Sequence, residues 1–576
     1  MASHKQSVIV KLVLLTSFMI LGLYVFVTND KASVIDSNIV VYAAINTTQS
    51  EHMNMDHSMP TNINMSAFNM MQINSSSTNN IIFDTLSEQD KPLLCGDNKV
   101  RYTSYVKEFI TPILCSQPVG IAVDKDNNVW IASGKSGNLF VFNPSTEQFV
   151  ETIRIPNWPE QNRNLGSMIW DMKFDNNGDL WFTDELSNSI WKYFTKEGKF
   201  ENYRLLQEGG YPLSLTIDSD NNVWFTQVFG KRLGFLEPDK VINNTTKGIS
   251  ELDMSKQINF QTMGPISNGF NNTNTTGSID NRDSRALWFS TAVFPVGGQI
   301  IKFDKVSQSL TIHDLNYTRS IPFSIAEDEN GFLWANNHIS NLFLWLDPNT
   351  GAVKQYATSN PSASGNLTTL PYINQYKDGK IWFNEHYGNA IASFDLKTNT
   401  LVEYYIPTHN PLWINSSNPL RFTFDNNGSV WFTEWTENKL GVIPTDQLKQ
   451  LPISVEVSKN NITLDSVNKK GDSLEVSISS NLIDNQTKSI NNTNNSNTSV
   501  AMSVTSSISK NGKLDNLTSS FNPSNVSIEN IDSQQFKTVL KIDPKEGVNP
   551  GNYTLTITAK YGDEIAISKI VDMFVK

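Results

Sequence analysis

Short apolar stretches alternate with polar turns along most of the chain, and one order of stretches recurs seven times. Each repeat has an apolar strand, an acidic or Asn-Gly turn, a strand that carries a tryptophan, and further apolar strands. The tryptophans stand at spacings of 51, 43, 64, 46, 48 and 49 residues, as Trp130, Trp181, Trp224, Trp288, Trp334, Trp382 and Trp431. Four short strands per repeat predict a propeller blade, because such a unit must stack on its neighbours. A row of unrelated β-meanders or an open solenoid is the alternative.

The two ends of the repeat region predict how a ring would close. The last repeat ends after its third strand, at residues 440–443, whereas an apolar strand at 105–110 precedes the first repeat. We expect this N-terminal strand to complete the last blade, which leaves no open sheet edge at the seam. The predicted fold class is all-β, a seven-bladed β-propeller.

A different pattern follows the repeats. Residues 451–576 alternate apolar and polar positions with period two, and turn residues separate the runs, which predicts a β-sandwich. The Pro-Gly-Asn-Tyr-Thr phrase at 550–554 resembles the immunoglobulin-like domains of prokaryotic surface proteins. Four segments are therefore predicted, namely a transmembrane or signal-anchor segment (1–30), an Asn-, Ser- and Met-rich stalk whose composition indicates disorder (31–98), the propeller (99–450) and the sandwich (451–576).

The first segment carries an export pattern. Lys5 and Lys11 precede an apolar run from Leu12 to Val27, and with the residues before it this run approaches the length that spans a bilayer. We expect a single-pass membrane anchor that leaves the C-terminal bulk outside the cell. A cleaved signal peptide, with a small-residue site near Ala43, would instead give a secreted protein.

Composition and cysteine content fit an exported protein. The formal net charge is −12, from 45 basic and 57 acidic side chains without a basic stripe, so nucleic acid is not an expected partner. Cys95 and Cys115 are the two cysteines, and outside the cell they would form a disulfide, with free thiols as the alternative. Many Asn-X-Ser/Thr sequons, including those at Asn461 and Asn552, predict a glycoprotein, although the Asn-rich composition produces some by chance.

The predicted stalk contains a run of histidines and methionines. These residues are His52, Met53, Met55, His57 and Met59. Thioethers beside imidazoles at this spacing suit Cu(I), and the run resembles methionine-rich segments of extracytoplasmic copper proteins. Copper storage or buffering is one hypothesis for the stalk, and a polar linker that happens to contain methionine is the other.

The blade phrases resemble a known family. Trp431-Phe432-Thr433-Glu434, followed by Asn438, is similar to the blades of streptogramin B lyases (virginiamycin B lyase) and, more loosely, of NHL-type propellers. The resemblance covers about residues 106–445. It implies a seven-bladed ring with a Mg²⁺-assisted site at one end of the channel, where the family opens an ester-linked ring by elimination.

The residues that the family uses for this chemistry are missing from the chain. The resemblance implies a His directly after the proline that opens the innermost strand in two late blades, and a Glu before one of these prolines. The equivalent positions after the proline are Val119, Trp170, Leu213, Ile266, Phe323, Tyr372 and Leu420. Streptogramin lyase activity by the family mechanism is therefore not expected.

A second constellation lies three and four residues beyond the late tryptophans. His338, Glu385, His386 and Glu434 stand there, and equivalent positions of adjacent blades are neighbours in a propeller, with Glu185 across the ring. Imidazoles and carboxylates together suit Zn²⁺, Mn²⁺ or Mg²⁺, and His386 with Glu385 could serve as an acid or base. The alternative is structural: the Glu belongs to the blade phrase, and the histidines hydrogen-bond to neighbouring loops.

Other inward positions are candidates for binding. Arg421 could hold an anionic group, while Trp170, Phe323 and Tyr372, with Leu213 and Leu420, could line a pocket for a flat ligand or plug the channel. Two function classes follow. The first is a membrane-anchored binding module for a small molecule or a surface partner. The second is a metal-assisted lyase or hydrolase of esters or lactones.

Overall fold

The structure is a computed structural model. It describes residues 91–158, 168–185, 187–241, 247–268, 285–293, 297–315, 321–338, 340–359, 371–481, 502–509, 517–522, 535–545 and 547–576. The predicted membrane segment, the stalk with its copper candidates, and the Asn-rich stretches at 271–283 and 485–499 lie outside these residues. Within the described ranges, no helix has both the length and the apolar character that a membrane span needs.

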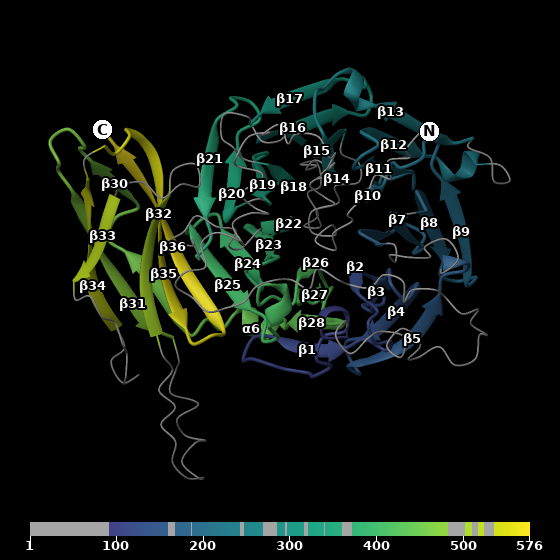
Figure 1. Ribbon diagram of the computed structural model, residues 1–576, viewed down its shortest axis with the longest axis horizontal. Coiled ribbons are helices and arrows are strands. Elements are labelled where there is room, and N and C mark those ends of the chain that lie inside the picture. The colour runs from purple at the N-terminus through teal and green to yellow at the C-terminus, as the bar shows by residue number, and fades with distance from the viewer. Residues whose placement is uncertain are drawn as a thin grey trace, which may run out of the picture.

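The chain forms consecutive units of four antiparallel strands arranged around a common centre (Figure 1). The first three units are single four-stranded sheets. Their strands are β2 (Pro118–Val123), β3 (Val129–Ser133), β4 (Asn138–Asn143) and β5 (Gln148–Arg154); β6 (Met172–Phe174), β7 (Leu180–Asp184), β8 (Ser189–Phe194) and β9 (Lys199–Arg204); and β10 (Pro212–Ile217), β11 (Val223–Gln227), β12 (Arg232–Leu236) and β13 (Ile249–Asp253).

Units four to six repeat this order. Their strands are β14 (Thr262–Asn268), β15 (Ala286–Val293), β16 (Gly297–Asp304) and β17 (Leu310–Asp314); β18 (Pro322–Glu327), β19 (Leu333–Asn337), β20 (Leu342–Leu346) and β21 (Val353–Ala357); and β22 (Pro371–Lys377), β23 (Lys380–Glu385), β24 (Ala390–Asp395) and β25 (Thr400–Tyr405). Units four and five are single sheets, whereas β22–β25 belong to a larger, eight-stranded sheet.

The last unit confirms the predicted closure. Strands β26 (Pro419–Phe424), β27 (Val430–Glu434) and β28 (Lys439–Ile443) are completed by β1 (Lys107–Ile110), which pairs with β28 in antiparallel register. The innermost strand of each unit contacts that of the next, and β26 contacts β2, so the described strands form a closed β-propeller. Short helices lie between strands, at α4 (Lys91–Leu94), η2 (Pro238–Lys240), η3 (Met254–Lys256), η6 (Pro411–Trp413) and α6 (Thr445–Leu448).

The recurrent turn explains the repeated phrase. Asp124 accepts hydrogen bonds from the backbone N–H of Asn128 and, at 2.8 Å, from the indole Nε1–H of Trp130. Four more units have the same Asp-to-Trp bond, six residues apart, at Trp181, Trp224, Trp334 and Trp431. Within each turn an Asn or Gly has positive φ, for example Asn127 at 67°, a conformation that these residues adopt at low cost.

The C-terminal strands form two sheets (Figure 1). One contains β29 (Ile453–Val457), β31 (Asp472–Ser480), β34 (Gln535–Pro544) and β33 (Leu517–Asn522), and the other contains β32 (Met502–Ser509), β35 (Gly551–Tyr561) and β36 (Ile565–Val575), with β30 (Asn461–Leu464) parallel to β36. Val476 of the first sheet and Ile557 of the second lie in one apolar core.

The second C-terminal sheet continues the sixth unit of the propeller. Strand β36 pairs antiparallel with β25, from Thr400 opposite Lys569 to Tyr404 opposite Ile565. The hydroxyl of Thr554 also donates to the carbonyl of Gln355 at 2.6 Å. The predicted boundary near residue 450 therefore separates the propeller from the C-terminal sheets along the sequence. In space, main-chain hydrogen bonds join the two.

Candidate functional site

The residues four positions beyond the blade tryptophans lie at the same end of successive units. They include Glu185, His338, His386 and Trp435, and all four side chains are buried. The first two follow β7 and β19, and the last two follow β23 and β27. Each of these strands is buried along its whole length or nearly so. The buried strand therefore fixes the position of the residue that follows it.

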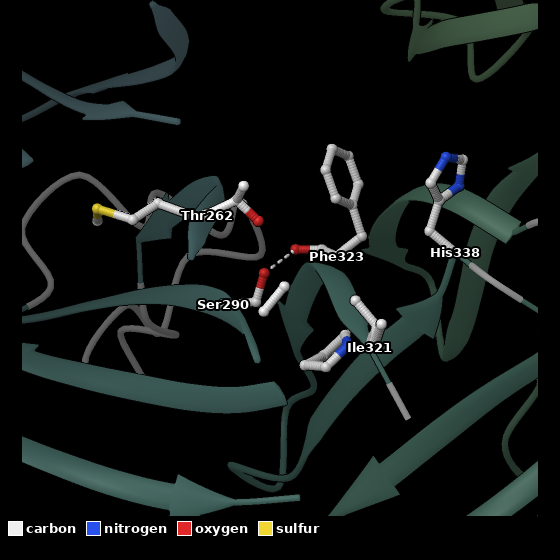
Figure 2. A pocket seen from close by; sticks show the side chains of 9 residues that line it. Thr262, Ser290, Ile321, Phe323 and His338 are labelled. Carbon is white, nitrogen blue, oxygen red and sulfur yellow. Dashed lines mark hydrogen bonds between the residues drawn. The ribbon is translucent and has the colours of Figure 1, made fainter. Parts of the chain in front are cut away.

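Two histidines and two aromatic rings form a stack in units five and six. The rings of His338 and His386 are parallel, with centroids 5.7 Å apart. Tyr372 lies 4.7 Å from His338 and stacks on Phe323 at 4.5 Å. Figure 2 shows the Phe323 and His338 rings extending to the same side of their strands. The structure thus brings together four of the residues singled out in the sequence.

Burial makes this stack electrically neutral. It lowers the pKa of His338 to about 4 and that of His386 well below its ordinary value, and the neighbouring imidazole lowers the latter further. The pKa of the Tyr372 hydroxyl is raised, again mainly by burial. Both imidazoles are therefore uncharged at neutral pH and can donate or accept hydrogen bonds.

Arg421, on the innermost strand β26, brings a positive charge to this region. Its Nη1 lies 3.6 Å from Asp171 Oδ1, and both side chains are about nine-tenths buried. Asp171 also accepts hydrogen bonds from the Ser214 hydroxyl and the backbone N–H of Leu215, so its charge is shared among several donors. No motif in the sequence distinguished Asp171.

A second carboxyl group, Glu185, lies on the same unit as Asp171. Glu185 accepts a hydrogen bond from Trp170 Nε1 at 2.9 Å, and burial raises the pKa of Glu185 to about 7. Charges on Arg421, Glu185 and Asp171 all influence the Tyr372 hydroxyl, so these groups face one central region.

Several polar atoms in this region are buried without a hydrogen-bond partner among the described residues. They are Tyr372 Oη, His338 Nδ1, Arg421 Nε and Nη2, Trp435 Nε1 and both ring nitrogens of His386, which the Asn418 amide approaches without hydrogen-bond geometry. Buried polar groups without partners are few in folded proteins and each needs an explanation. Here they gather on three successive units.

The two glutamates of the predicted metal cluster have other neighbours. Glu385 of β23 is directed to Glu403 of β25 across the small residues of β24, and burial together with the Glu403 carboxyl raises the pKa of Glu385 well above its ordinary value. Glu434 lies near Glu108, whose carboxylate forms a fully buried 2.9 Å ion pair with Lys439. Burial and then Glu108 raise the pKa of Glu434.

In the parts of the chain that the structure describes, no three His, Cys, Asp or Glu side chains are placed to hold one metal ion. The histidines of the predicted cluster meet one another, while Glu385 and Glu434 face separate carboxyl partners. Metal binding by His338, Glu385, His386 and Glu434 stays a prediction, as does the catalytic role of His386 with Glu385.

Apolar residues at or near the start of the innermost strands pack together. Trp170, Leu213, Phe323, Tyr372 and Leu420 belong to one cluster and are at most 5% exposed. The small pocket beside Phe323 and His338 in Figure 2 has room for about one water molecule. These side chains therefore fill the centre of the ring in this structure.

A further set of repeated residues is structural. Asn188, Asn389 and Asn438 stand seven positions beyond their tryptophans with φ of 55° to 56°. Each side-chain oxygen accepts a hydrogen bond from the backbone of the next unit, such as Ser417 N to Asn389 Oδ1 at 2.8 Å. This recurrence is visible in the sequence, but the sequence does not show which atoms the asparagine side chains bond to.

Comparisons with known proteins found similar chains among solved structures. No protein-family model matches the chain, and no curated protein does. Among solved structures, a streptogramin B lyase is 27% identical over 59% of this chain and 96% of its own, with a TM-score of 0.46. Virginiamycin B lyase from Staphylococcus aureus is 21% identical over 60% and 99%, also at 0.46. The extracellular domain of a one-component system from B. thetaiotaomicron is 13% identical over 80% and 57%, at 0.43. The protein is a β-propeller by its own strand pairing, and it is similar to the streptogramin B lyase structures.

Proposed function

We propose that the protein is a binding module whose propeller holds a small molecule at the centre of units five to seven. The central site comprises Phe323, His338, Tyr372, His386, Arg421 and Trp435. One observation carries the proposal. Hydrogen-bonding atoms that have no partner among the described residues gather among aromatic rings at that place. A ligand that displaced part of the apolar packing at the centre and bonded to these atoms would offset the cost of burying them.

The side chains define the chemistry of that ligand. Tyr372 and Phe323 offer flat apolar faces, and the neutral imidazoles of His338 and His386 offer hydrogen bonds without charge. Arg421 supplies the cation, since its 3.6 Å contact with Asp171 leaves Nε and Nη2 without partners among the described residues. A planar molecule with one acidic group fits this set.

The test is binding of 2-naphthoate to the full-length protein in lipid nanodiscs, measured by saturation-transfer NMR and titration calorimetry. We expect saturable binding that weakens by about 10- to 100-fold in Arg421→Gln and falls in His386→Ala. His313→Ala and Arg204→Gln, which change the same residue types away from the centre, should bind as the unchanged protein does. Equal affinity in all four variants would contradict the proposal.

A metal-assisted lyase or hydrolase of esters or lactones is the second candidate, and Glu185 favours it. A buried carboxyl group with a pKa of about 7 can exchange a proton near neutral pH. Elemental analysis of the protein and of His386→Ala separates the two candidates, since a divalent ion lost with His386 would favour the enzyme. The absence of bound metal in both would favour the binding module.

We also propose that the propeller is displayed outside the cell from its N-terminal segment, or secreted if that segment is cleaved. The apolar run from Leu12 to Val27 supports this proposal, as does the disulfide between Cys95 and Cys115. On intact expressing cells, externally added protease should digest the propeller, whereas resistance that disappears on lysis would place it inside.

Two finer assignments accompany this proposal. The C-terminal sheets are proposed to be an immunoglobulin-like module, since two antiparallel layers share one core. The stalk residues His52, Met53, Met55, His57 and Met59 are proposed to bind copper. Copper that is present in the full chain and lost on deletion of residues 51–71 would support the second assignment, and equal copper in both would contradict it.

A further inference from the structure

The segment Lys91–Asp97, here called the strap, lies against the seventh unit beside the central site. We propose that the strap is a cover latched by the Cys95–Cys115 disulfide, and that reduction of this bond releases it. The inference rests on the proposed function, because it concerns access to that same site.

Side chains of the propeller hydrogen-bond to the backbone of the strap. Three consecutive carbonyl groups of the strap accept hydrogen bonds from side chains of the loops next to unit seven. The donors are Asn410 Nδ2 to Pro92 at 3.1 Å, Trp413 Nε1 to Leu93 at 2.8 Å, and Asn438 Nδ2 to Leu94 at 3.4 Å. Hydrogen bonds to three consecutive carbonyl groups hold the strap in one register. They do not depend on the identity of the strap's side chains.

A short series of contacts links the strap to the central site. The ring of Trp413, which donates to Leu93, packs edge-on against Trp435 with centroids 5.2 Å apart. Trp435 occupies in unit seven the position that His386 occupies in unit six. Leu93 is itself buried, with 8% of its surface exposed. The strap therefore covers the unit-seven wall of the central site.

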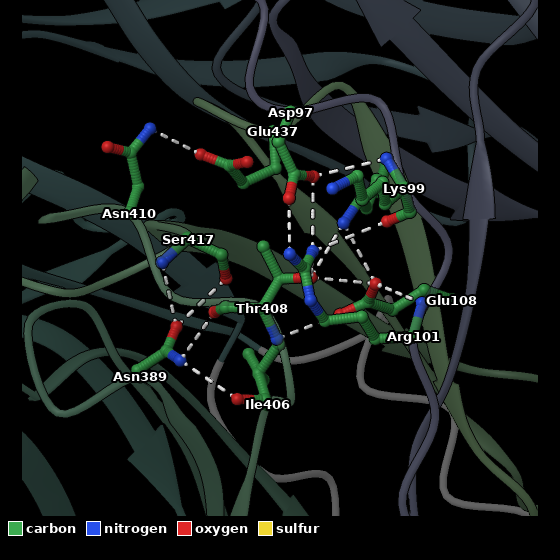
Figure 3. A network of polar contacts seen from close by, with 11 residues as sticks. Asp97, Lys99, Arg101, Glu108, Asn389, Ile406, Thr408, Asn410, Ser417 and Glu437 are labelled. Atoms are coloured by element: carbon green, nitrogen blue, oxygen red, sulfur yellow. Dashed lines mark hydrogen bonds and ion pairs between the residues drawn. The ribbon is translucent and has the colours of Figure 1, made fainter. Parts of the chain in front are cut away.

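The backbone around the Cys95–Cys115 disulfide is closely packed and strained. Gly96 has φ of 62°, and a side chain there would lie 2.4 Å from Glu437 Oε2. Cys115 also has positive φ, at 59°, which a residue with a β-carbon rarely adopts. Figure 3 shows how Asn410 bonds to Glu437 while Arg101 bonds to Asp97 at the end of the strap. Breaking the disulfide would let Cys115 leave this conformation.

The release step is an ordinary thiol–disulfide exchange. A dithiol reductant supplies two electrons and two protons, becomes a disulfide itself, and leaves Cys95 and Cys115 as thiols. The bond closes a loop across a sequence separation of 20 residues. Loss of such a link shifts an opening equilibrium by a factor on the order of 100. The three hydrogen bonds and the burial of Leu93 then remain to hold the strap.

Hydrogen–deuterium exchange of the full-length protein, with and without dithiothreitol, tests the proposal. Amides of residues 93–97 and 412–418 should exchange at least tenfold faster after reduction, and the Cys95→Ser/Cys115→Ser double variant should exchange as fast without reductant. Trp413→Phe, which keeps the ring and the disulfide but removes the bond to Leu93, should change exchange only a few fold. Unchanged exchange in the reduced protein and in the double variant would overturn the inference.

Binding of 2-naphthoate supplies the second readout. Its association rate should rise about tenfold in the double variant, and dithiothreitol should have no further effect there. Faster exchange without faster association would overturn the role of the strap as a cover. Where neither form binds the probe, the proposed function fails on its own, and the exchange measurement still decides whether the disulfide latches the strap.

Discussion

Asn389 illustrates how much of this fold depends on side chains that bond to backbone. Its Nδ2 donates to the carbonyls of Ile406 and Thr408, and its Oδ1 accepts from Ser417, so one residue joins the end of unit six to the start of unit seven. Its φ of 56° also suits asparagine better than most residues. Recurrent polar residues near a propeller centre are therefore no guide to catalysis by themselves.

Replacement of Asn389 tests this role. Asn389→Ala should lower the free energy of unfolding by about 3 kcal/mol, because it leaves buried backbone groups without partners and places alanine at positive φ. Asn389→Gly should recover the part that comes from the backbone. Chemical denaturation measures both, with Asn399→Ala as the control, since Asn399 has φ of 52° in a partly exposed turn. A loss equal to that of the control would contradict the assignment.

Glu185 leads to a prediction about pH. Its pKa is raised in the folded protein, to about 7, so its neutral form favours folding, and stability is lost as pH rises from the unfolded pKa towards 7. Glu185→Gln should therefore lose less stability between pH 5 and pH 8 than the unchanged protein, by about 3 kcal/mol. Denaturant titrations at the two pH values measure this, with the exposed Glu208→Gln as control. Parallel losses in all three proteins would show that Glu185 titrates normally.

At the scale of the element, the sequence predicted the strands well because their causes are local. The Asp-to-Trp turn is complete within seven residues, so its spacing is visible along the chain. The closing strand was predicted because the last repeat has three strands, whereas an additional strand precedes the first repeat. The carboxyl partners of Glu385 and Glu434 were missed, because Glu403 and Glu108 approach them from other strands and no sequence spacing records that approach.

The closing strand β1 is held by a buried charge pair. Lys439 Nζ bonds to Glu108 Oε2 at 2.9 Å and to the Thr408 hydroxyl at 2.6 Å, with the Lys439 and Glu108 side chains fully buried. Lys439→Met should lower the free energy of unfolding by about 3–5 kcal/mol, because it leaves the Glu108 carboxylate uncompensated. Adding Glu108→Leu should restore much of this loss. Thermal unfolding of the single and double variants gives the coupling, and additive losses would contradict it.

At the scale of the molecule, the sheet shared by β25 and β36 makes the propeller and the C-terminal sheets one structure. Sequence composition changes at residue 450 and predicted two domains, but it could not reveal that the last strand of the chain pairs with unit six. The ion pair of Lys354 with Asp572 adds a second link across the same boundary. A C-terminal module attached in this way has a fixed position beside unit six.

Calorimetry tests this continuity. The full-length protein should unfold in one cooperative transition, because separating the two parts would expose the paired edges of β25 and β36. Truncation after residue 450 should lower the transition temperature and promote aggregation through β25. Two well-separated transitions in the full chain, with the first part unaffected by truncation, would contradict the assignment.

The pairing of β25 with β36 also has a consequence for synthesis. Residues 406–564, 159 in all, separate the two strands, so a ribosome needs about 10–30 s to make the partner after β25 has emerged. During that interval the outer edge of unit six lies open to other chains. Nascent chains halted between these strands should therefore bind chaperones that recognise extended segments, and completion of β36 should release them.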